Sequence, residues 1–417
     1  MALSNLQTLG IALSRAIVTP AIGGAVATVC RRAIASHRFF ATDAGGNKPA
    51  PIAFVFDVDG VLLQGNQEVL PQALKAMGRL FSDSKDMPKV PVAFLTNSGG
   101  MSERRRAHQL ANLLDVPITG DQIVLSHTPF RPLAEEYSNK PVLVVGRGDV
   151  MEISKSYGFR ATVTTSQLAK ALPLAVPFWS EVDKYIGGPC SGRYVPSLRS
   201  GTPDNPIQAV FVFSDPTEWY TDLQLLVDTL VGGGVLGRRK SEIPSGTPPV
   251  PVFFSNPDIL WSNQFSAPRF GQGAFAACVE LLYEKATGER LPPNIVKFMG
   301  KPNPEPYRVI ENLLTEQAVA LGLLPEKALE FSSSASANPP PFSAIYSIGD
   351  TRNTDVRGAN NAGRPWHSVL VQTGTKYHYD EGKEEDPADI VSEDVDTAIL
   401  AALEHAKGLD ANLVSLK

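Results

Sequence analysis

An unbroken apolar segment that runs directly into two aspartates is the feature that most constrains this chain. Residues 52–60 read Ile-Ala-Phe-Val-Phe-Asp-Val-Asp-Gly, so the apolar run ends at Asp57 and Asp59. Such a run, without polar alternation, is typical of a strand buried on both faces of a parallel sheet. Asp57 would then lie at the carboxyl end of the strand, the edge at which open α/β sheets bind their ligands.

Two other interpretations of this segment have to be weighed. Asp-x-Asp-Gly is most often a solvated turn, which only further motifs downstream can outweigh. The segment also begins like a calcium-binding loop, with Glu68 at the twelfth position. In a calcium loop the glycine stands at the sixth position and a helix precedes it, whereas Gly60 stands at the fourth and follows a strand-like run. A calcium loop is therefore excluded.

Strands and helices alternate after the two aspartates. Apolar residues at helical spacing occupy 70–81, and a second apolar strand over 91–95 leads directly to Thr96 and Asn97. A further helix is expected over 104–114. Strand, helix, strand and helix in this order predict parallel strands joined by right-handed crossovers.

Two later segments bring further charged residues to the same sheet. Residues 344–350 form a third apolar strand that ends at Asp350, and Asp355 follows five positions later. Lys301 lies in a Gly-Lys-Pro motif just before an expected helix. Because parallel strands bring their carboxyl ends to one edge, these side chains and Asp57 can converge there.

The composition changes between residues 120 and 265. Strands recur there, but two long stretches rich in Gly, Pro and Ser, 186–207 and 232–250, read as surface loops. We interpret 120–265 as a mixed α/β domain inserted between the two halves of the first domain, 51–119 and 266–417. The expected fold class is therefore α/β, a parallel-sheet core interrupted by a second α/β domain.

The first forty residues differ from the rest. They carry four arginines and no Asp, Glu or Lys, and apolar residues spaced by three and four between positions 6 and 17 form one helical face. An acid-free, Arg-bearing amphipathic segment is typical of a mitochondrial transit peptide. A secretory signal is the competing interpretation, which Pro20 and the lack of a cysteine framework disfavour. We expect residues 1–40 to direct the chain to mitochondria, with the matrix as destination, and 41–50 to form a linker.

Composition excludes several classes of function. The net charge is −5, and Arg104-Arg105-Arg106 is a single short basic cluster, so we expect no nucleic-acid partner. No window approaches about eighteen uninterrupted apolar residues, so no transmembrane segment is expected. Three scattered cysteines cannot form a disulfide framework or a zinc site. The sequence leaves the oligomeric state open, a homo-oligomer included.

The residues at the strand ends suit phosphoryl transfer. The candidates are Asp57, Asp59, Thr96, Asn97, Lys301, Asp350 and Asp355. Several carboxylates packed together repel one another unless a cation joins them, and carboxylate oxygens suit magnesium, which shares its coordination sphere with substrate phosphate. Lys301 adds a positive charge, and Thr96 with the backbone amides of 97–99 adds neutral donors. Transfer of a phosphoryl group to a carboxylate needs this combination of an anion-binding half and a metal-binding half.

In this order, the motifs resemble those of the haloacid dehalogenase superfamily of phosphohydrolases. Asp-x-Asp-Gly-Val, Thr-Asn-Ser-Gly-Gly, Gly-Lys-Pro and Gly-Asp-x-x-x-x-Asp are all present. The insert between the second and third motifs resembles the C2 cap of subfamily IIA, and Ser-Asn-Pro-Asp at 255–258 fits that subfamily. Segments 125–130 and 269–273 are similar to its cat-eye-syndrome-critical-region branch, which is linked to mitochondria. The resemblance implies a Rossmann-like core with a C2-type cap.

The resemblance also implies a division of roles. Asp57 would be the nucleophile that forms an aspartyl-phosphate, and Asp59 the acid and then the base. The phosphoryl oxygens would be held by Thr96, Asn97 and Lys301. Magnesium would be held by Asp57, Asp350 and the Asp59 carbonyl, with Asp355 orienting these ligands.

The expected function is a magnesium-dependent phosphohydrolase of a small phosphorylated metabolite in mitochondria. Asn256 and Asp258 are candidates for substrate contacts from the cap, whereas Trp261 and Phe270 are expected in core packing or along the cleft. The alternative is a non-catalytic or accessory protein of the same fold, linked to glycerophospholipid biosynthesis as some relatives of this branch are. A phosphomutase would use the same aspartyl chemistry. The sequence does not reveal the substrate.

Overall fold

The computed structural model describes residues 50–65, 68–81, 88–178, 199–261, 265, 267–329, 339–374 and 386–409. The predicted transit peptide and all but the last residue of the predicted linker lie outside these ranges. None of the helices within them has the length and hydropathy needed to span a bilayer.

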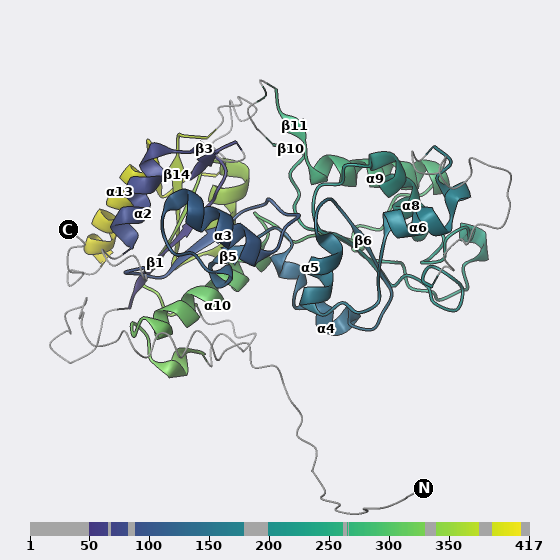
Figure 1. Ribbon diagram of the computed structural model, residues 1–417, viewed down its shortest axis with the longest axis horizontal. Helices are drawn as coiled ribbons and strands as arrows, with labels where there is room; N and C mark the ends of the chain where they lie inside the picture. Colours follow the sequence, from purple (N-terminus) through teal and green to yellow (C-terminus); the bar gives the residue numbers. More distant parts are fainter. Residues whose placement is uncertain are drawn as a thin grey trace, which may run out of the picture. The chain divides into compact units, whose positions relative to one another are not determined.

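A six-stranded sheet in the order β15-β14-β13-β1-β4-β5 is the first of two large sheets (Figure 1). Its strand pairs are parallel throughout. The strands are β1 (Ile52–Phe56), β4 (Val92–Leu95), β5 (Ile123–Val124), β13 (Ala344–Gly349), β14 (Trp366–Val371) and β15 (Ile390–Ser392). The prediction of a parallel sheet around the strand that precedes Asp57 is confirmed.

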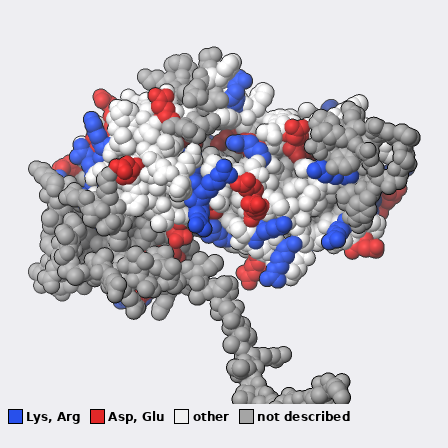
Figure 2. Space-filling model, in the orientation of Figure 1, with Lys and Arg blue, Asp and Glu red and all other residues white. Residues whose placement is uncertain are grey.

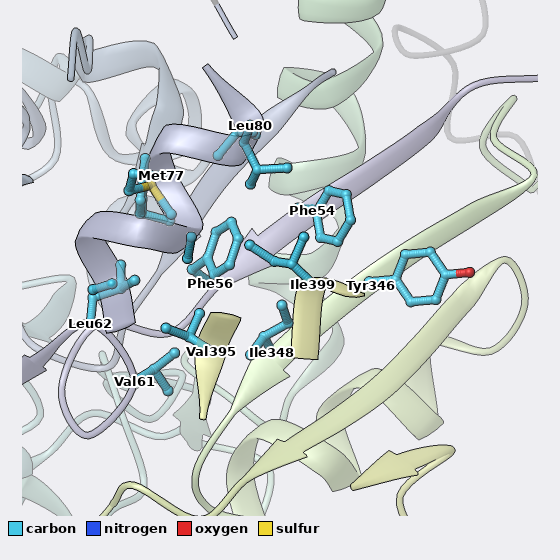
Figure 3. Close-up of a cluster of buried hydrophobic side chains, with 14 of the residues drawn as sticks. Phe54, Phe56, Val61, Leu62, Met77, Leu80, Tyr346, Ile348, Val395 and Ile399 are labelled. Atoms are coloured by element: carbon cyan, nitrogen blue, oxygen red, sulfur yellow. The ribbon is translucent and has the colours of Figure 1, made fainter. Parts of the chain in front are cut away.

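Strand β1 is buried on both faces because helices cover both sides of the sheet. Phe54 and Phe56 pack in one hydrophobic cluster, and Ala53 and Val55 pack in another. Helices α2 and α13 supply side chains to the first cluster (Figure 3), and α10 and α12 to the second. The helices that pack against this sheet are α2 (Pro71–Leu80), α3 (Glu103–Leu114), α10 (Pro304–Ala320), α12 (Arg357–Ala362) and α13 (Val395–Leu409). Since burial of one Phe side chain contributes about 1.5–3 kcal/mol, this packing holds the end of β1 firmly in place.

A second, five-stranded sheet has the order β12-β9-β8-β6-β7, again with parallel pairs. Its strands are β6 (Val142–Val145), β7 (Thr162–Thr164), β8 (Ala209–Val212), β9 (Val252–Phe254) and β12 (Val296–Phe298). Helices α6, α8 and α9 pack in one hydrophobic cluster with this sheet, and α4 and α5 in another. These helices are α4 (Leu133–Tyr137), α5 (Val150–Tyr157), α6 (Thr165–Ala171), α8 (Trp219–Val231) and α9 (Gln272–Thr287).

The sheets do not follow the predicted domain boundaries. Strand β5 pairs with β4, so the start of the predicted insert, 120–265, belongs to the first sheet. Strand β12 pairs with β9, and Phe275 and Val279 of α9 lie in a core cluster of the second sheet, so the start of the predicted segment 266–417 belongs to the second. The predicted boundaries followed the change in composition, whereas strand pairing decides which sheet a segment joins; the division into domains stays a prediction.

Short elements complete the described residues. Two antiparallel hairpins are formed by β2 (Leu63–Gln64) with β3 (Glu68–Val69) and by β10 (Leu260–Trp261) with β11 (Arg269–Phe270). Trp261 and Phe270 are 40% and 71% exposed, so their expected place in core packing is wrong. The short helical turns are Gly120–Gln122, Thr128–Phe130, Pro173–Ala175, Lys240–Glu242, Glu326–Ala328 and Arg352–Val356. On the face shown in Figure 2, basic and acidic side chains are interspersed.

Candidate active site

Lys301 joins two carboxylates at the carboxyl edge of the first sheet. Its Nζ lies 2.9 Å from Asp57 Oδ1 and 2.6 Å from Asp355 Oδ1. It also donates a hydrogen bond to the Leu95 carbonyl at 3.1 Å. Asp57 follows β1 and Asp355 follows β13, both in the first sheet, but Lys301 follows β12 of the second. The second sheet therefore delivers the cation to the acidic edge of the first.

The charges of this group act against the effect of burial. Lys301 is 3% exposed. Burial would lower its pKa, but Asp355 and Asp57 outweigh burial and raise the pKa of Lys301 well above its usual value. Burial raises the pKa of Asp57 well above its usual value, and the charge of Lys301 opposes that rise. The ammonium thus opposes, without cancelling, the protonation of Asp57 that burial favours.

Three carboxylates form a group with the chemistry of a metal site. Oxygen atoms of Asp57, Asp350 and Asp355 all lie within 4.8 Å of one another. Burial raises the pKa of Asp350 to about 7, and the charge of Asp355 adds to the rise. Carboxylates this close repel one another, and an oxygen-rich, buried acidic group fits a divalent ion such as magnesium. The Asp59 carboxylate lies outside this group, and the predicted ligand role of the Asp59 carbonyl stays a prediction.

Two glycines enclose Asp350. Gly60 has φ +85°, and a Cβ atom there would lie 2.3 Å from Asp350 Oδ2. A Cβ atom at Gly374 would lie 1.8 Å from the same oxygen. Thr373 Oγ1 donates to the Gly60 carbonyl at 2.7 Å, so the loops after β14 and β1 are joined at this point. Only residues without a side chain allow the backbone to approach the carboxylate this closely.

Asp59 has a different environment from Asp57. Burial raises the pKa of Asp59, and the charges of Arg106 and, to a smaller extent, Lys301 oppose the rise. Asp59 pairs with Leu63 in an isolated bridge, which fixes the backbone just after β1. The two aspartates are therefore one residue apart but are influenced by different cations.

Thr96 begins the loop after β4. It is 2% exposed, and its Oγ1 accepts a hydrogen bond from the Ser98 amide and donates one to Ser98 Oγ, both at 3.1 Å. Its own amide donates to the Val124 carbonyl at 3.1 Å. The threonine is thus fixed at the edge where Asp57 lies, and its contact with a phosphoryl oxygen stays a prediction.

The Asn97 side chain and backbone form hydrogen bonds with the two segments of the second sheet that contain Asp258 and Lys301. Its Nδ2 donates to Asp258 Oδ2 at 3.0 Å and to the Lys301 carbonyl at 3.1 Å, and its Oδ1 accepts from the Lys301 amide at 3.0 Å. Asn256 Nδ2 donates to the Asn97 carbonyl at 3.2 Å. Because the Asn97 side chain is fully engaged, only its backbone amide remains for a phosphoryl oxygen.

The two cap candidates are held by the same network. The Asp258 amide donates to Asn256 Oδ1 at 3.1 Å, and the Asn256 amide donates to Gln272 Oε1 at 3.1 Å. Burial raises the pKa of Asp258 to about 6, and the hydrogen bond from Asn97 opposes the rise. Their place beside Asn97 brings both residues to the site, and a substrate contact for either stays a prediction.

Close backbone contacts fix the second sheet against the Thr96 loop. The Asp149 amide donates to the Gly100 carbonyl at 3.1 Å, and a Cβ atom at Gly148 would lie 2.0 Å from that same carbonyl oxygen. Arg105 Nη1 pairs with Asp149 Oδ2 at 2.8 Å on the surface. The sequence shows Gly100 and Gly148 as separate glycines, and it does not show that the two lie against each other in the fold.

Sequence reasoning missed a buried network around Glu103. Glu103 Oε1 accepts hydrogen bonds from Tyr157, Thr128 and Arg131, and His127 Nδ1 lies 2.8 Å from Tyr157 Oη. Burial lowers the pKa of His127 to about 4. The network joins α3 to α5, which packs on the second sheet. The Ser-His-Thr-Pro segment at 126–129 contains two of its residues, but the sequence does not show that Glu103 and Tyr157 are their partners.

Family models match two separate parts of the chain. A haloacid dehalogenase-like hydrolase model matches residues 54–160, and a HAD-hydrolase-like model matches residues 298–398. These ranges include Asp57, Thr96, Lys301 and Asp350.

Two curated relatives cover most of the chain. A mitochondrial hydrolase of Saccharomyces cerevisiae is 34% identical over 373 residues, which are 88% of this chain and 98% of the relative. A cardiolipin synthase (CMP-forming)/mitochondrial hydrolase fusion protein of Schizosaccharomyces pombe is 35% identical over 344 residues, which are 81% of this chain. The chain matches only 51% of the length of that fusion protein.

Solved structures share the fold at low sequence identity. A hypothetical protein of Pyrococcus horikoshii OT3 has a TM-score of 0.53 and 19% identity, with coverage of 84% of this chain and 99% of the other. Glycerol phosphate phosphatase of Mycobacterium tuberculosis, in complex with magnesium, has a TM-score of 0.51 and 18% identity, with coverage of 84% and 76%.

Proposed function

The chain belongs to the haloacid dehalogenase-like hydrolases, and on that premise we propose that this enzyme is a magnesium-dependent phosphatase of a small phosphorylated metabolite. Two parallel sheets with their helices make up its α/β fold, and we assign the second sheet to an inserted cap of the C2 type. The observation that carries the proposal is the contact of Lys301 with Asp57 beside two further carboxylates. A cation and a metal-binding acidic group around one buried carboxylate suit the transfer of a phosphoryl group to it.

Asp57 would act as the nucleophile and Asp59 as the acid and base. An Asp57 oxygen forms a bond to phosphorus while the bond to the leaving oxygen breaks, and Asp59 gives that oxygen a proton. A water molecule then attacks the phosphorus of the aspartyl-phosphate, and Asp59 accepts the proton of the water. Inorganic phosphate leaves, and Asp57 is regenerated. The separate environments of the two aspartates support this division of work.

Neutral and positive donors would hold the phosphoryl oxygens. These donors would be Thr96 Oγ1, the backbone amide of Asn97 and Lys301 Nζ. Donors fixed before the reaction stabilise charge that develops on phosphoryl oxygens without the cost of reorganisation. The hydrogen bonds that fix Thr96 and Asn97 support this role.

Asp57, Asp350 and the Asp59 carbonyl would hold the magnesium ion. When bound, magnesium neutralises charge on the transferring phosphoryl group. Asp355 would orient the site instead of ligating the metal. Its Oδ1 accepts from Lys301, and its Oδ2 accepts from the Thr351 amide at 3.1 Å, so both of its oxygens are already engaged.

We place the enzyme in mitochondria, in the matrix. The acid-free, Arg-bearing composition of residues 1–40 supports this location, and both curated relatives carry the word mitochondrial in their names. Import of the chain fused to a fluorescent protein, with and without residues 1–40, tests it. A cytosolic signal for the intact fusion would contradict the location.

A second candidate is an accessory role in glycerophospholipid biosynthesis, without catalysis. The relative in which a similar chain is fused to a cardiolipin synthase favours a link of this kind. Turnover separates the candidates, because an accessory protein releases no phosphate. A phosphomutase, which shares the aspartyl chemistry, would produce an isomeric phosphate ester in place of free phosphate.

Hydrolysis of p-nitrophenyl phosphate by the purified chain tests the proposal. We expect phosphate release with magnesium and none after removal of the metal by a chelator. Asp57→Asn keeps the size of the side chain but removes the nucleophile, so this variant should remain folded and lose turnover. Unchanged activity without magnesium, or retained turnover in Asp57→Asn, would overturn the assignment.

A further inference from the structure

Two successive glycines leave the Thr96 loop with little conformational restriction of its own. The loop runs from Thr96 to Ser102, the N-cap residue of α3, and Gly99 and Gly100 lie in its middle. Gly100 has φ +85°, a backbone conformation that few residues other than glycine adopt. Contacts from outside the loop must therefore fix the backbone that carries the Asn97 amide.

Residues 126 and 127 hold the loop on both sides of the two glycines. The Ser126 amide donates a hydrogen bond to the Ser98 carbonyl at 3.2 Å, and His127 Nε2 lies 3.1 Å from the Met101 carbonyl oxygen. A Cβ atom at Gly99 would lie 3.2 Å from His127 Cδ2. The imidazole ring therefore lies against the glycine segment that it fixes.

The partners of the imidazole determine which nitrogen carries its proton. Burial lowers the pKa of His127 to about 4, so the ring is neutral at pH 7 and carries one proton. The Met101 carbonyl can only accept a hydrogen bond, so this proton is assigned to Nε2. Nδ1 is then an acceptor, and the Tyr157 hydroxyl, 2.8 Å away, is the group that can donate to it.

Tyr157 connects the histidine to charged groups. Its hydroxyl also lies 2.5 Å from Glu103 Oε1, so its one proton has two acceptors, Nδ1 and this carboxylate. The Arg131 guanidinium lies 5.0 Å from the centre of the Tyr157 ring and donates to the same carboxylate oxygen at 3.2 Å. Tyr157 belongs to α5, which packs on the second sheet, and Glu103 belongs to α3. Residues that pack on different sheets thus orient the His127 ring.

We propose that His127 is a positioning residue for the proposed phosphoryl transfer. Its Nε2–H fixes the Met101 carbonyl, and this contact holds the Thr96 loop so that the Asn97 amide meets the phosphoryl group. The inference rests on the proposed phosphatase function. Donors that are fixed before the reaction stabilise charge that develops on phosphoryl oxygens, so loss of the Nε2 bond weakens both the binding of phosphate and the rate of its transfer.

Three substitutions separate the two ring nitrogens. His127→Gln places an amide nitrogen near the position of Nε2 and keeps a donor to the Met101 carbonyl. His127→Asn keeps a polar group near the position of Nδ1 but is too short for that donor, and His127→Phe keeps only a ring. We expect kcat for p-nitrophenyl phosphate to fall by about 10-fold in His127→Asn and His127→Phe, and to stay within about 3-fold of the wild-type value in His127→Gln.

Inhibition by inorganic phosphate distinguishes positioning from stability. Partial unfolding lowers kcat in proportion to the folded fraction, but it does not change the phosphate affinity of the molecules that remain folded. We expect the inhibition constant of phosphate to rise by about 5-fold in His127→Asn and His127→Phe, and to stay near the wild-type value in His127→Gln. The same substitutions at His108, an exposed histidine of α3, are the matched control and should change neither quantity.

The tautomer of His127 can be measured in the intact chain. In isotopically labelled histidine, the protonated and the bare ring nitrogen have different chemical shifts, so NMR at pH 7 identifies the nitrogen that carries the proton. The signal that a His127 variant lacks assigns the resonance. We expect the proton on Nε2.

Three results would overturn the inference. They are a proton on Nδ1, equal kcat values in His127→Gln and His127→Asn, and an unchanged inhibition constant of phosphate in both His127→Asn and His127→Phe. Hydrolysis of p-nitrophenyl phosphate by the wild-type chain reports on the proposed function, whereas the tautomer and the comparison among variants report on His127. A failure of the phosphatase assignment is therefore distinguishable from a failure of the role of His127.

Discussion

The carboxyl edges of the two sheets contribute different chemistry to one site. The edge of the first sheet carries Asp57, Asp350 and Asp355, acids that lie close enough together to require a cation. The edge of the second sheet carries Asn256, Asp258 and Lys301, which reach the first sheet through a lysine ion pair and hydrogen bonds to Asn97. The first sheet thus carries the carboxylates proposed to react and to bind the metal, and the second sheet supplies the lysine that pairs with them.

The first edge is thus proposed to carry the residues that the reaction requires, and the second edge those that contact the leaving group of the substrate. Few residue types can accept a phosphoryl group or hold magnesium, so the first edge is restricted to acids. Many residue types can contact a leaving group, so the second edge carries no such restriction. Substitutions on the two edges should therefore differ in kind as well as in size.

The largest effect is expected at the point where the two edges meet. Lys301→Met removes the cation between Asp57 and Asp355 and leaves two buried carboxylates without it. We expect kcat for p-nitrophenyl phosphate to fall by about 10³-fold, with a lower free energy of unfolding because buried charges lose their partner. Steady-state kinetics with thermal denaturation measure both.

Lys301→Arg is the control for this comparison. It keeps a charge but changes the shape, so it should keep more stability than Lys301→Met. Near wild-type kcat in Lys301→Met would show that the second sheet does not supply an essential cation.

A smaller effect is expected from Gly60→Ala on the first edge. A Cβ atom would lie 2.3 Å from Asp350 Oδ2, and φ +85° disfavours a side chain. We expect the free energy of unfolding to fall by about 1–3 kcal/mol, measured by chemical denaturation. We also expect magnesium to bind more weakly, measured by a metal titration of the activity. Gly288→Ala, with φ +75° and nothing within 4 Å, is the matched control for backbone strain alone. If the two variants lost the same free energy of unfolding and bound magnesium equally well, the close approach of Gly60 to Asp350 would have no role in the metal site.

The smallest effect is expected on the second edge, and it depends on pH. The folded pKa of Asp258 is raised to about 6 from its ordinary value of 3.8, so the folded state binds its proton more tightly than the unfolded state. Ionisation therefore destabilises the fold as the pH rises through this range, and the penalty is absent below the unfolded pKa.

Asp258→Asn should remove this penalty while its amide oxygen keeps the bond from Asn97. We expect Tm to exceed the wild-type value by about 2–4 °C at pH 8 and to match it near pH 4. A pH-independent difference in Tm would show that the charge of Asp258 is not the cause.

The first sheet was predictable because its signals are local. The apolar run before Asp57 and the motifs at Thr96 and Asp350 each specify a strand and its end within ten residues. Their convergence followed from the rule for parallel strands, and the structure brings Asp57, Lys301, Asp350 and Asp355 together. Their catalytic roles stay predictions.

The second sheet shows what local signals cannot supply. Strand β12 precedes Lys301 and follows the predicted insert, so its place in the sequence indicates the first sheet. It pairs instead with β9 of the second sheet. Arg106 was indistinguishable from Arg104 and Arg105 because burial depends on which helix face meets the core. The partners of Asn97 lie 161 and 204 residues away in the chain, a separation that no local pattern encodes.

Trapping of the covalent intermediate shows directly which residue accepts the phosphoryl group. The enzyme with magnesium and p-nitrophenyl phosphate is quenched in acid during turnover, and its peptides are analysed by mass spectrometry. We expect the added mass of one phosphoryl group on Asp57 and no such mass in Asp57→Asn. A phosphoryl group on another residue of the turning-over enzyme would contradict it.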